Sequence, residues 1–133
     1  MSAYVLDTHP LLFYAARKLA KLGRKARNAF EEFERGEACL YVPAPVVIET
    51  WRLTLNGTIV LSTSLDTWWA EIQVDELVQI DLTAEDVLRA ASLDWEHKDL
   101  FDRLIVATAL RLDCPLLTRD GAITGWGGVE TVW

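Results

Sequence analysis

Short apolar runs, separated by segments with helical spacing, are the feature that most constrains the fold. The runs at residues 3–6 (AYVL) and 115–118 (PLLT) are continuous rather than alternating in polarity, as expected for strands buried on both faces. Further candidate strands lie at residues 38–42, 77–82 and 129–133. Because helical segments separate the candidates, the strands are expected to be parallel. The sequence predicts an α/β fold of three layers, with a short central parallel sheet of four or five strands.

Capping residues and helix breakers locate the helices. Pro10 suits the first turn of a helix, and Asn56–Gly57 is a typical C-terminal signal. Thr83 and Asp86 nearly form a capping box, and Pro115 ends the last of these helices. The first predicted helix begins at about His9, and the others cover residues 24–35, 46–55, 64–75, 83–92 and 99–113.

The length and composition favour one domain over residues 1–133. A chain of 133 residues has no room for two cores, and 51% apolar with 25% charged residues suits a protein that buries one. A membrane span is not expected, since every stretch of about 18 residues contains charges or helix breakers. No signal peptide is recognisable, and Cys39 and Cys114 form no C-x-x-C pattern. We therefore expect a cytoplasmic protein with two buried thiols.

Two features bear on partners. The mean hydropathy of +0.14 and the six Trp residues suggest apolar surface that faces a homodimer partner or another protein. The pair Trp68–Trp69 is expected in the core or at a dimer interface. The net charge of −7 argues against nucleic-acid binding by bulk electrostatics. However, six of the 13 basic residues fall within one acid-free stretch: Arg17, Lys18, Lys21, Arg24, Lys25 and Arg27. This stretch is either a solvated helix face or a surface that contacts RNA phosphates.

Four carboxylates are expected at one edge of the sheet. Asp7 directly follows the first strand, and Asp120 follows the strand at 115–118. Glu49 lies early in the helix after residues 38–42, and Asp102 lies near the start of the helix that precedes residues 115–118. Ligands of open α/β sheets bind at the carboxyl ends of the strands, which is where these elements place all four acids.

The surroundings of these acids favour a metal ion. Asp102 shares a helical stripe with Ile105, Val106 and Ala109, and burying an unpaired acid costs several kcal/mol. Only Arg52 and Arg103 are nearby cations in the sequence. Hard divalent ions with oxygen ligands, Mg²⁺ or Mn²⁺, fit such a cluster, with one or two ions bound. Zinc is not expected, because His9, His97, Cys39 and Cys114 lack ligand spacing, and both His residues are expected to be structural or on the surface.

Each acid also has a plainer explanation. Asp7 could cap the helix that follows it, and Asp120 could belong to an ordinary turn. Asp99 could cap its helix and pair with Arg103, which is also a candidate partner for Asp102. Each explanation is credible alone, but all four acids meeting at one edge by chance is much less so.

The same residues carry a resemblance to a known family. The sequence resembles PIN-domain ribonucleases, specifically the toxin component of VapBC-type toxin–antitoxin pairs. The matching motifs are VLDTHPLLFY (5–14), VIETWRL (47–53), HKDLFDRLIVATAL (97–110) and LLTRD (116–120). The chain departs from the family pattern at Leu100, where Pro is frequent, and at Pro10, where a small residue is frequent. Neither departure removes an acid.

The resemblance implies a metal-dependent endoribonuclease that uses Mg²⁺ or Mn²⁺ and is inhibited by a cognate antitoxin. The family's acidic quartet carries over onto Asp7, Glu49, Asp102 and Asp120. Thr8 and Thr118 match the hydroxyl residues beside those acids, and Asp99 is a possible supporting acid at the edge of the site. The family cuts structured RNAs such as transfer RNA and ribosomal RNA.

Two other functions stay open. A catalytically idle PIN-like module would bind RNA or protein without cutting it. A receiver-like signalling domain also carries acids at strand ends, but it needs a Lys after a late strand, and the four Lys residues are at positions 18, 21, 25 and 98.

Overall fold

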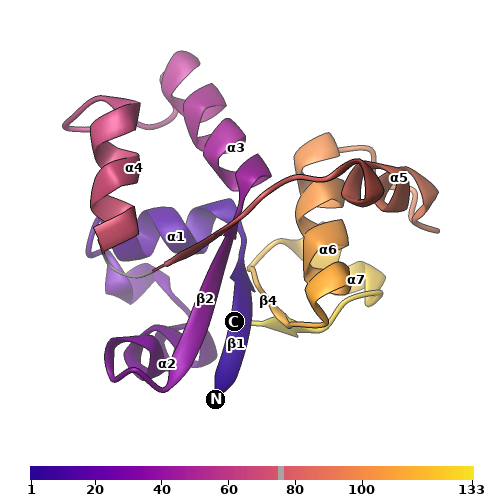
Figure 1. Ribbon diagram of the computed structural model, residues 1–133, viewed down its shortest axis with the longest axis horizontal. Coiled ribbons are helices and arrows are strands. Elements are labelled where there is room, and N and C mark those ends of the chain that lie inside the picture. Colours follow the sequence, from indigo (N-terminus) through magenta and orange to yellow (C-terminus); the bar gives the residue numbers. More distant parts are fainter. Residues whose placement is uncertain (75–76) are drawn as a thin grey trace.

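A five-stranded parallel sheet forms the centre of the computed structural model, which describes residues 1–74 and 77–133 (Figure 1). The sheet order is β3-β2-β1-β4-β5, and every pair of neighbouring strands is parallel. The prediction of an α/β fold with four or five parallel strands is thus confirmed, with five. The strands are β1 (Ser2–Leu6), β2 (Ala38–Pro43), β3 (Val78–Ile80), β4 (Leu116–Leu117) and β5 (Thr131–Val132).

Helices cover both faces of this sheet. Figure 1 shows α1 and α2 on one side and α6 and α7 on the other, which gives the three predicted layers. The chain moves from β1 to β2 in one direction and from β4 to β5 in the other, so right-handed crossovers place the connecting helices on opposite faces. The described helices are α1 (Thr8–Ala15), α2 (Arg24–Glu34), α3 (Ala44–Leu55), α4 (Leu65–Val74), α5 (Ala84–Ser92), α6 (Leu100–Leu112) and α7 (Gly121–Trp126), with a 3₁₀ turn at Leu19–Lys21.

The ends of the helices differ from the predicted ends by one or two residues in several places. Helix α3 begins at Ala44 instead of residue 46, because Pro45 is tolerated in a first turn. Helix α7 was not predicted at all. The helix predicted over residues 64–75 is α4, and the last predicted residue, Asp75, lies outside the described residues. The Thr83 capping box is complete, since the side chains of Thr83 and Asp86 each accept a hydrogen bond from the other's backbone N–H.

The core lies along the middle strands. Val5 and Leu6 of β1 and both residues of β4 are fully buried, as the continuous apolar runs predicted. Trp68 of α4 packs in this core, which is one of the two places expected for it, the other being a dimer interface.

Two other expectations about the chain can be compared with the structure. Cys39 and Cys114 are free thiols, but they are half-buried instead of buried, so that prediction was wrong. No helix in the described residues is both long enough and apolar enough to cross a membrane.

The reversal of strand order creates the place where the site lies. Strands β1 and β4 are neighbours, yet the chain leaves them in opposite directions. In open α/β sheets, the crevice outside the carboxyl ends of two such strands is the usual place for a ligand. Asp7 directly follows β1, and Asp120 follows β4 by two residues, so both acids lie at this crevice.

Candidate functional site

Three of the predicted acids begin helices at the crevice. Asp7 is the N-cap of α1 and accepts a hydrogen bond from the Thr8 N–H at 2.8 Å. Asp99 is the N-cap of α6, and Asp120 is the N-cap of α7, where it accepts from the Ile123 N–H at 3.0 Å. The capping roles considered from the sequence for Asp7 and Asp99 are therefore real, and Asp120, for which an ordinary turn was considered, also caps a helix. They do not oppose a functional role, because capping by Asp99 and Asp120 uses only one carboxylate oxygen of each.

Thr118 links the first and last of these acids. Its hydroxyl donates to the second carboxylate oxygen of Asp7 at 2.6 Å, and it accepts from the Asp120 N–H at 3.0 Å. Thr118 and Asp7 are both buried, so this bridge between β1 and the end of β4 is shielded from solvent. The side chain of Thr118 thus orients Asp7, the structural part of the supporting role predicted for it.

Glu49 faces the same crevice from α3. Its side chain is 10% exposed and accepts a hydrogen bond from Arg52 Nη2 at 3.0 Å. The Arg52 guanidinium also lies 4.7 Å from the centre of the Phe101 ring. Arg52 is therefore held between α3 and α6 instead of being free in solvent, and Glu49 is the one predicted acid with an arginine partner in the described residues.

Asp102 has a partner that the sequence analysis did not identify. His97 Nε2 lies 2.6 Å from Asp102 Oδ2, and both side chains are largely buried. The pairing of Arg103 with Asp99 or Asp102, considered from the sequence, was wrong. Arg103 instead donates four hydrogen bonds to backbone carbonyls, one near the end of α5 and three in the segment between α5 and α6.

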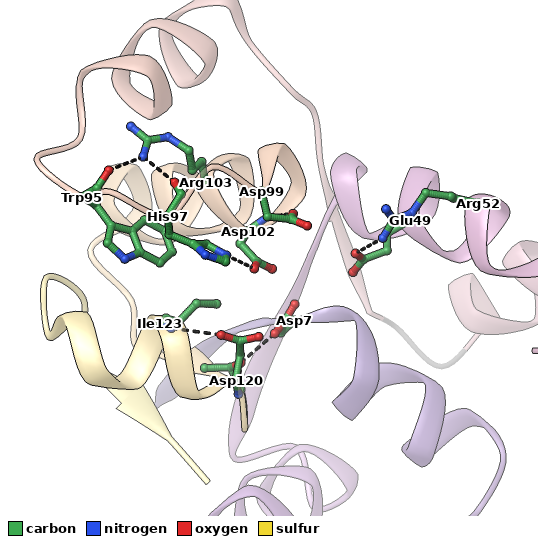
Figure 2. A network of polar contacts seen from close by, with 11 residues as sticks. Asp7, Glu49, Arg52, Trp95, His97, Asp99, Asp102, Arg103, Asp120 and Ile123 are labelled. Atoms are coloured by element: carbon green, nitrogen blue, oxygen red, sulfur yellow. Dashed lines mark hydrogen bonds and ion pairs between the residues drawn. The ribbon is translucent and has the colours of Figure 1, made fainter. Parts of the chain in front are cut away.

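These side chains surround one cavity of about 420 Å³. Figure 2 shows the carboxylates of Asp7, Asp102 and Asp120 pointing toward a common space, with Glu49 facing it from α3. The lining consists of Asp7, His9, Glu49, Asp99, Asp102, Arg119, Asp120 and Gly121. The topology therefore brings all four predicted acids and Asp99 to one place. Thr8 lies beside it, with a buried hydroxyl that finds no hydrogen-bond partner among the described residues.

The surroundings disfavour the charged forms of the deepest acids. Burial raises the pKa of Asp7 above its ordinary value, and the negative charge of Glu49 adds to the shift, although the bonds from Thr118 and Thr8 oppose it. Burial also raises the pKa of Asp102, to about 6. The negative charges of Asp7, Asp99 and Asp120 add to this increase, and the hydrogen bond from His97 opposes it. Such shifts are expected where carboxylates gather without enough positive charge.

The donor set suits a hard divalent cation. Five carboxylates line the cavity, and oxygen is the ligand that Mg²⁺ and Mn²⁺ prefer. Within residues 1–74 and 77–133, however, no three acidic, His or Cys side chains are already grouped as metal ligands. The contacts explain why: Asp7 is turned to Thr118, Asp102 to His97 and Glu49 to Arg52. Mutual repulsion keeps carboxylates apart until a cation joins them.

The predicted basic stretch is divided by the structure. Lys18 and Lys21 line a second cavity of about 470 Å³, which shares His9 with the acidic one. Arg17 pairs with Glu34, and Arg27 donates to the Leu19 carbonyl, so these two side chains are engaged within the chain. The remaining members, Arg24 and Lys25, are exposed on α2.

Arg119 is a further residue that sequence reasoning missed. It directly precedes Asp120, lines the acidic cavity and lies 4.9 Å from the centre of the Phe13 ring. Lys21 lies 5.5 Å from the centre of the same ring. The two cations come from segments far apart in the sequence, and only the fold brings them together beside the acids. Arg119 stands in the LLTRD motif, and its position next to a site acid was the one available signal.

Comparisons with known proteins agree on the fold. No curated protein is similar enough in sequence to count as a match. The structure resembles a chain in the crystal structure of VapBC2 from Rickettsia felis bound to a promoter DNA fragment. The two share 15% identity over 97% of this chain and 96% of that one, with a TM-score of 0.68. DNA-bound VapBC from Salmonella typhimurium shares 15% identity over 98% of this chain and 97% of that one, with a TM-score of 0.66.

A third similar structure is VapBC-5 from Mycobacterium tuberculosis, a member of the VapBC family of toxin–antitoxin systems. It shares 14% identity over 98% of this chain and 94% of that one, with a TM-score of 0.58. At such low identities the likeness shows the fold alone. The PIN domain family, in contrast, matches the sequence itself over residues 4–124. Because this match spans most of the chain, the protein belongs to the PIN domain family.

Proposed function

We propose that the protein is a metal-dependent endoribonuclease and the toxin of a toxin–antitoxin pair, acting as one domain in the cytoplasm. The observation that carries the proposal is the cavity lined by Asp7, Glu49, Asp99, Asp102 and Asp120, an acidic space at the switch point of a PIN fold. Asp7, Glu49, Asp102 and Asp120 would hold one or two Mg²⁺ or Mn²⁺ ions. Thr8, Thr118 and Asp99 would support them. When bound, the cation neutralises the scissile phosphate and lowers the pKa of a water molecule, which attacks the phosphorus.

The residues of the chain have their own tasks in this reaction. The carboxylates would repel a phosphate on their own, so RNA enters the cavity only in the charge-neutralised state. Thr118 fixes one oxygen of Asp7, which limits the orientations of the acid nearest the sheet. The water would lose a proton as its oxygen forms the new bond to phosphorus, and the bond from phosphorus to one ribose oxygen would break, with that ribose oxygen taking up a proton. No side chain needs to form a covalent intermediate.

The test is cleavage of total RNA by purified protein with Mg²⁺ or Mn²⁺ and then with excess EDTA. We expect discrete fragments that require the metal and disappear in Asp7→Asn and in Asp120→Asn. The matched control is Asp113→Asn, because Asp113 lies at the far end of α6 in a left-handed conformation that Asn adopts readily. Cleavage that persists in the site variants would contradict the proposal. Metal binding without cleavage of any RNA would favour the idle-module alternative.

The second cavity supports a path for the RNA backbone. We expect Lys18, Lys21 and Arg119 to contact phosphates beside the cleavage site, since the two Lys line the second cavity, Arg119 lines the acidic one, and Lys21 and Arg119 both lie near the Phe13 ring. Arg24 and Lys25 remain candidates for weaker contacts, whereas the internal contacts of Arg17 and Arg27 limit their contribution. In cleavage-inactive protein, Lys21→Gln should weaken binding of a labelled single-stranded RNA several-fold. Lys25→Gln, the matched change on α2, should have a smaller effect.

Apolar side chains on α3 support a protein partner. Ile48, Trp51 and Leu55 recur at helical spacing and are 41%, 53% and 70% exposed. Leu100 at the start of α6 is also exposed, and α3 contacts α6. We expect this face to form a homodimer, so Trp51→Glu should shift the protein to a monomer in sedimentation experiments.

The cognate antitoxin is expected from the similar structures, which are complexes of VapBC systems. Co-expression of the chain with its genomic neighbour should relieve toxicity and give a complex that copurifies. A harmless chain that never copurifies with that neighbour would remove the toxin part of the proposal and leave the nuclease part standing.

A further inference from the structure

The segment that leads into α6 is fixed by one arginine. Arg103 donates from Nε to the Ala90 carbonyl at 2.9 Å and from Nη2 to the Leu93 carbonyl at 3.1 Å. Its Nη1 donates to the carbonyls of Trp95 and His97 at 2.7 and 2.8 Å (Figure 2). Three carbonyls of a connection without helix or strand, and one near the end of α5, are thus satisfied by a single side chain. The backbone of His97 is consequently held in one place relative to α6.

A stack of aromatic rings fixes the His97 side chain as well. The His97 ring centre lies 4.7 Å from that of Trp95, and Trp95 stacks on Trp126 with ring centres 4.7 Å apart and planes 17° from parallel. Trp126 Nε1 donates to the Asp94 carbonyl at 2.9 Å. Gly128 lies against the Trp126 ring, where a Cβ would find no space. The stack therefore ties the segment before α6 to α7, the helix that Asp120 caps.

The His97 ring contacts Asp102, one of the acids of the site. His97 Nε2 lies 2.6 Å from Asp102 Oδ2, and an ionised carboxylate only accepts, so Nε2–H is the donor in that state. Asp102 Oδ1 has no hydrogen-bond partner in the described part of the chain and lies at the acidic cavity. One oxygen of Asp102 is thus occupied by the imidazole, and the other is left for a ligand.

We infer that His97 is a positioning residue, which holds the Asp102 carboxylate in the orientation that binds the metal. The inference rests on the proposed function, because it assumes that Asp102 is a ligand. The His97 ring centre lies 4.7 Å from that of Trp95, and both its backbone and its Nε2 are hydrogen-bonded, whereas His9, the chain's other His, lines the acidic cavity with its ring centre 6.1 Å from that of Phe13. Groups that orient a metal ligand from behind typically change metal affinity by about 10- to 100-fold when they are lost.

The experiment measures the affinity of the metal-free protein for Mn²⁺ by calorimetry, so that it does not depend on finding the RNA target. His97→Phe keeps a ring for Trp95 to stack on but removes the donor. His97→Gln removes the ring but keeps an N–H donor near the position of Nε2. We expect His97→Phe to bind Mn²⁺ about 10- to 100-fold more weakly, and His97→Gln to recover most of that loss. Asp113→Asn, at the far end of α6, is the control and should change the affinity by less than about twofold.

Three results would overturn the inference, and they are distinguishable. Parental affinity in His97→Phe would show that the imidazole does not orient Asp102, while leaving the metal site intact. An equal loss in both His97 variants would assign the effect to direct coordination by the imidazole instead of to the hydrogen bond. Absence of Mn²⁺ binding by the parent would overturn the proposed metal site and, with it, the role of His97. Melting temperatures without metal check that each variant is folded.

Discussion

Asp86 and Asp102 are two carboxylates on neighbouring helices, the first buried and the second partly buried, and their surroundings are opposite. Asp86 is fully buried, and Arg111 binds it through Nε at 2.6 Å and Nη2 at 3.0 Å, while Thr83 completes a capping box. Asp102 has only an imidazole, and three further acids face it. Burial raises the pKa of both groups, but the bonds to Arg111 and Thr83 reverse this for Asp86, whose pKa falls below its ordinary value.

The difference separates an acid that stabilises the fold from one that awaits a ligand. The charge of Asp86 is neutralised within the chain by Arg111, so no charge is left there for a ligand to neutralise. The acidic cavity leaves its charge unsatisfied at a fixed place, which is expected of a site whose missing component is a cation. The following experiments test this contrast, from the largest expected effect to the smallest.

Replacing Asp102 should separate activity from stability. Asp102→Asn is expected to lower metal-dependent RNA cleavage by about 1,000-fold or more, which corresponds to about 4 kcal/mol in the barrier. The free energy of unfolding without metal should stay the same or increase, because an unfavourably buried charge is removed. Urea denaturation and cleavage rates measured on the same preparation check both parts. A large loss of stability would place Asp102 in the same class as Asp86.

Breaking the ion pair between Asp86 and Arg111 should lower stability and leave activity in place. Arg111→Met leaves the buried Asp86 without its cation and is expected to lower the free energy of unfolding by about 3–5 kcal/mol. Well below its melting temperature, the variant should retain metal-dependent cleavage. The double variant Asp86→Asn with Arg111→Met should recover part of the stability, because no uncompensated charge remains. A loss below about 1 kcal/mol in Arg111→Met would show that the pair contributes little.

The two acids should also give opposite slopes of stability against pH. The folded pKa of Asp102, about 6, lies above its ordinary value of 3.8, so between these values the folded state holds the extra proton. Metal-free protein should therefore lose a few °C of melting temperature as the pH rises from about 4.5 to 7. Asp86, with its lowered pKa, stabilises the fold above pH 3.8 and loses that effect only as the pH falls further. Asp102→Asn should flatten the first slope, and an unchanged slope would assign it to other groups.

The smallest effect is expected for an exposed pair on the same helix as Asp86. Glu85 and Arg89 of α5 lie 3.8 Å apart, with side chains 73% and 41% exposed. Solvent screens such a pair, so Glu85→Ala should change the free energy of unfolding by less than about 0.5 kcal/mol. A change as large as that of Arg111→Met would mean that position on α5, and not burial of the charge, determines the effect.

Most of the fold could be predicted because it depends on local signals. Continuous apolar runs marked the strands, and caps and breakers marked most helices within one or two residues. Helix α7 was missed because its six residues include Gly121 and Gly125, which are poor helix formers. Strands β4 and β5 have only two residues each in the structure, fewer than the apolar runs at 115–118 and 129–133 that predicted them.

The site was predictable only in part. Chain connectivity alone brings Asp7, Glu49, Asp102 and Asp120 to one edge of the sheet, and the structure gathers them around one cavity. The partners of these acids were not predictable. The spacing of Arg103 to Asp99 favoured an ion pair between these two residues. Arg103 instead binds backbone carbonyls of the preceding segment, and this places His97 beside Asp102. Contacts of this kind depend on the path of an irregular segment, for which the sequence carries no periodic signal.

The three capping acids have a consequence for how this protein could lose its activity over evolutionary time. At Asp7, Asp99 and Asp120, a side-chain oxygen holds the start of a helix. Asn and Ser can hold a helix start almost as well but cannot supply the charge. A lineage freed from the need to cut RNA would therefore be expected to drift toward Asn or Ser at these positions while avoiding Ala. Such a descendant would keep the shape of the cavity long after its chemistry had gone.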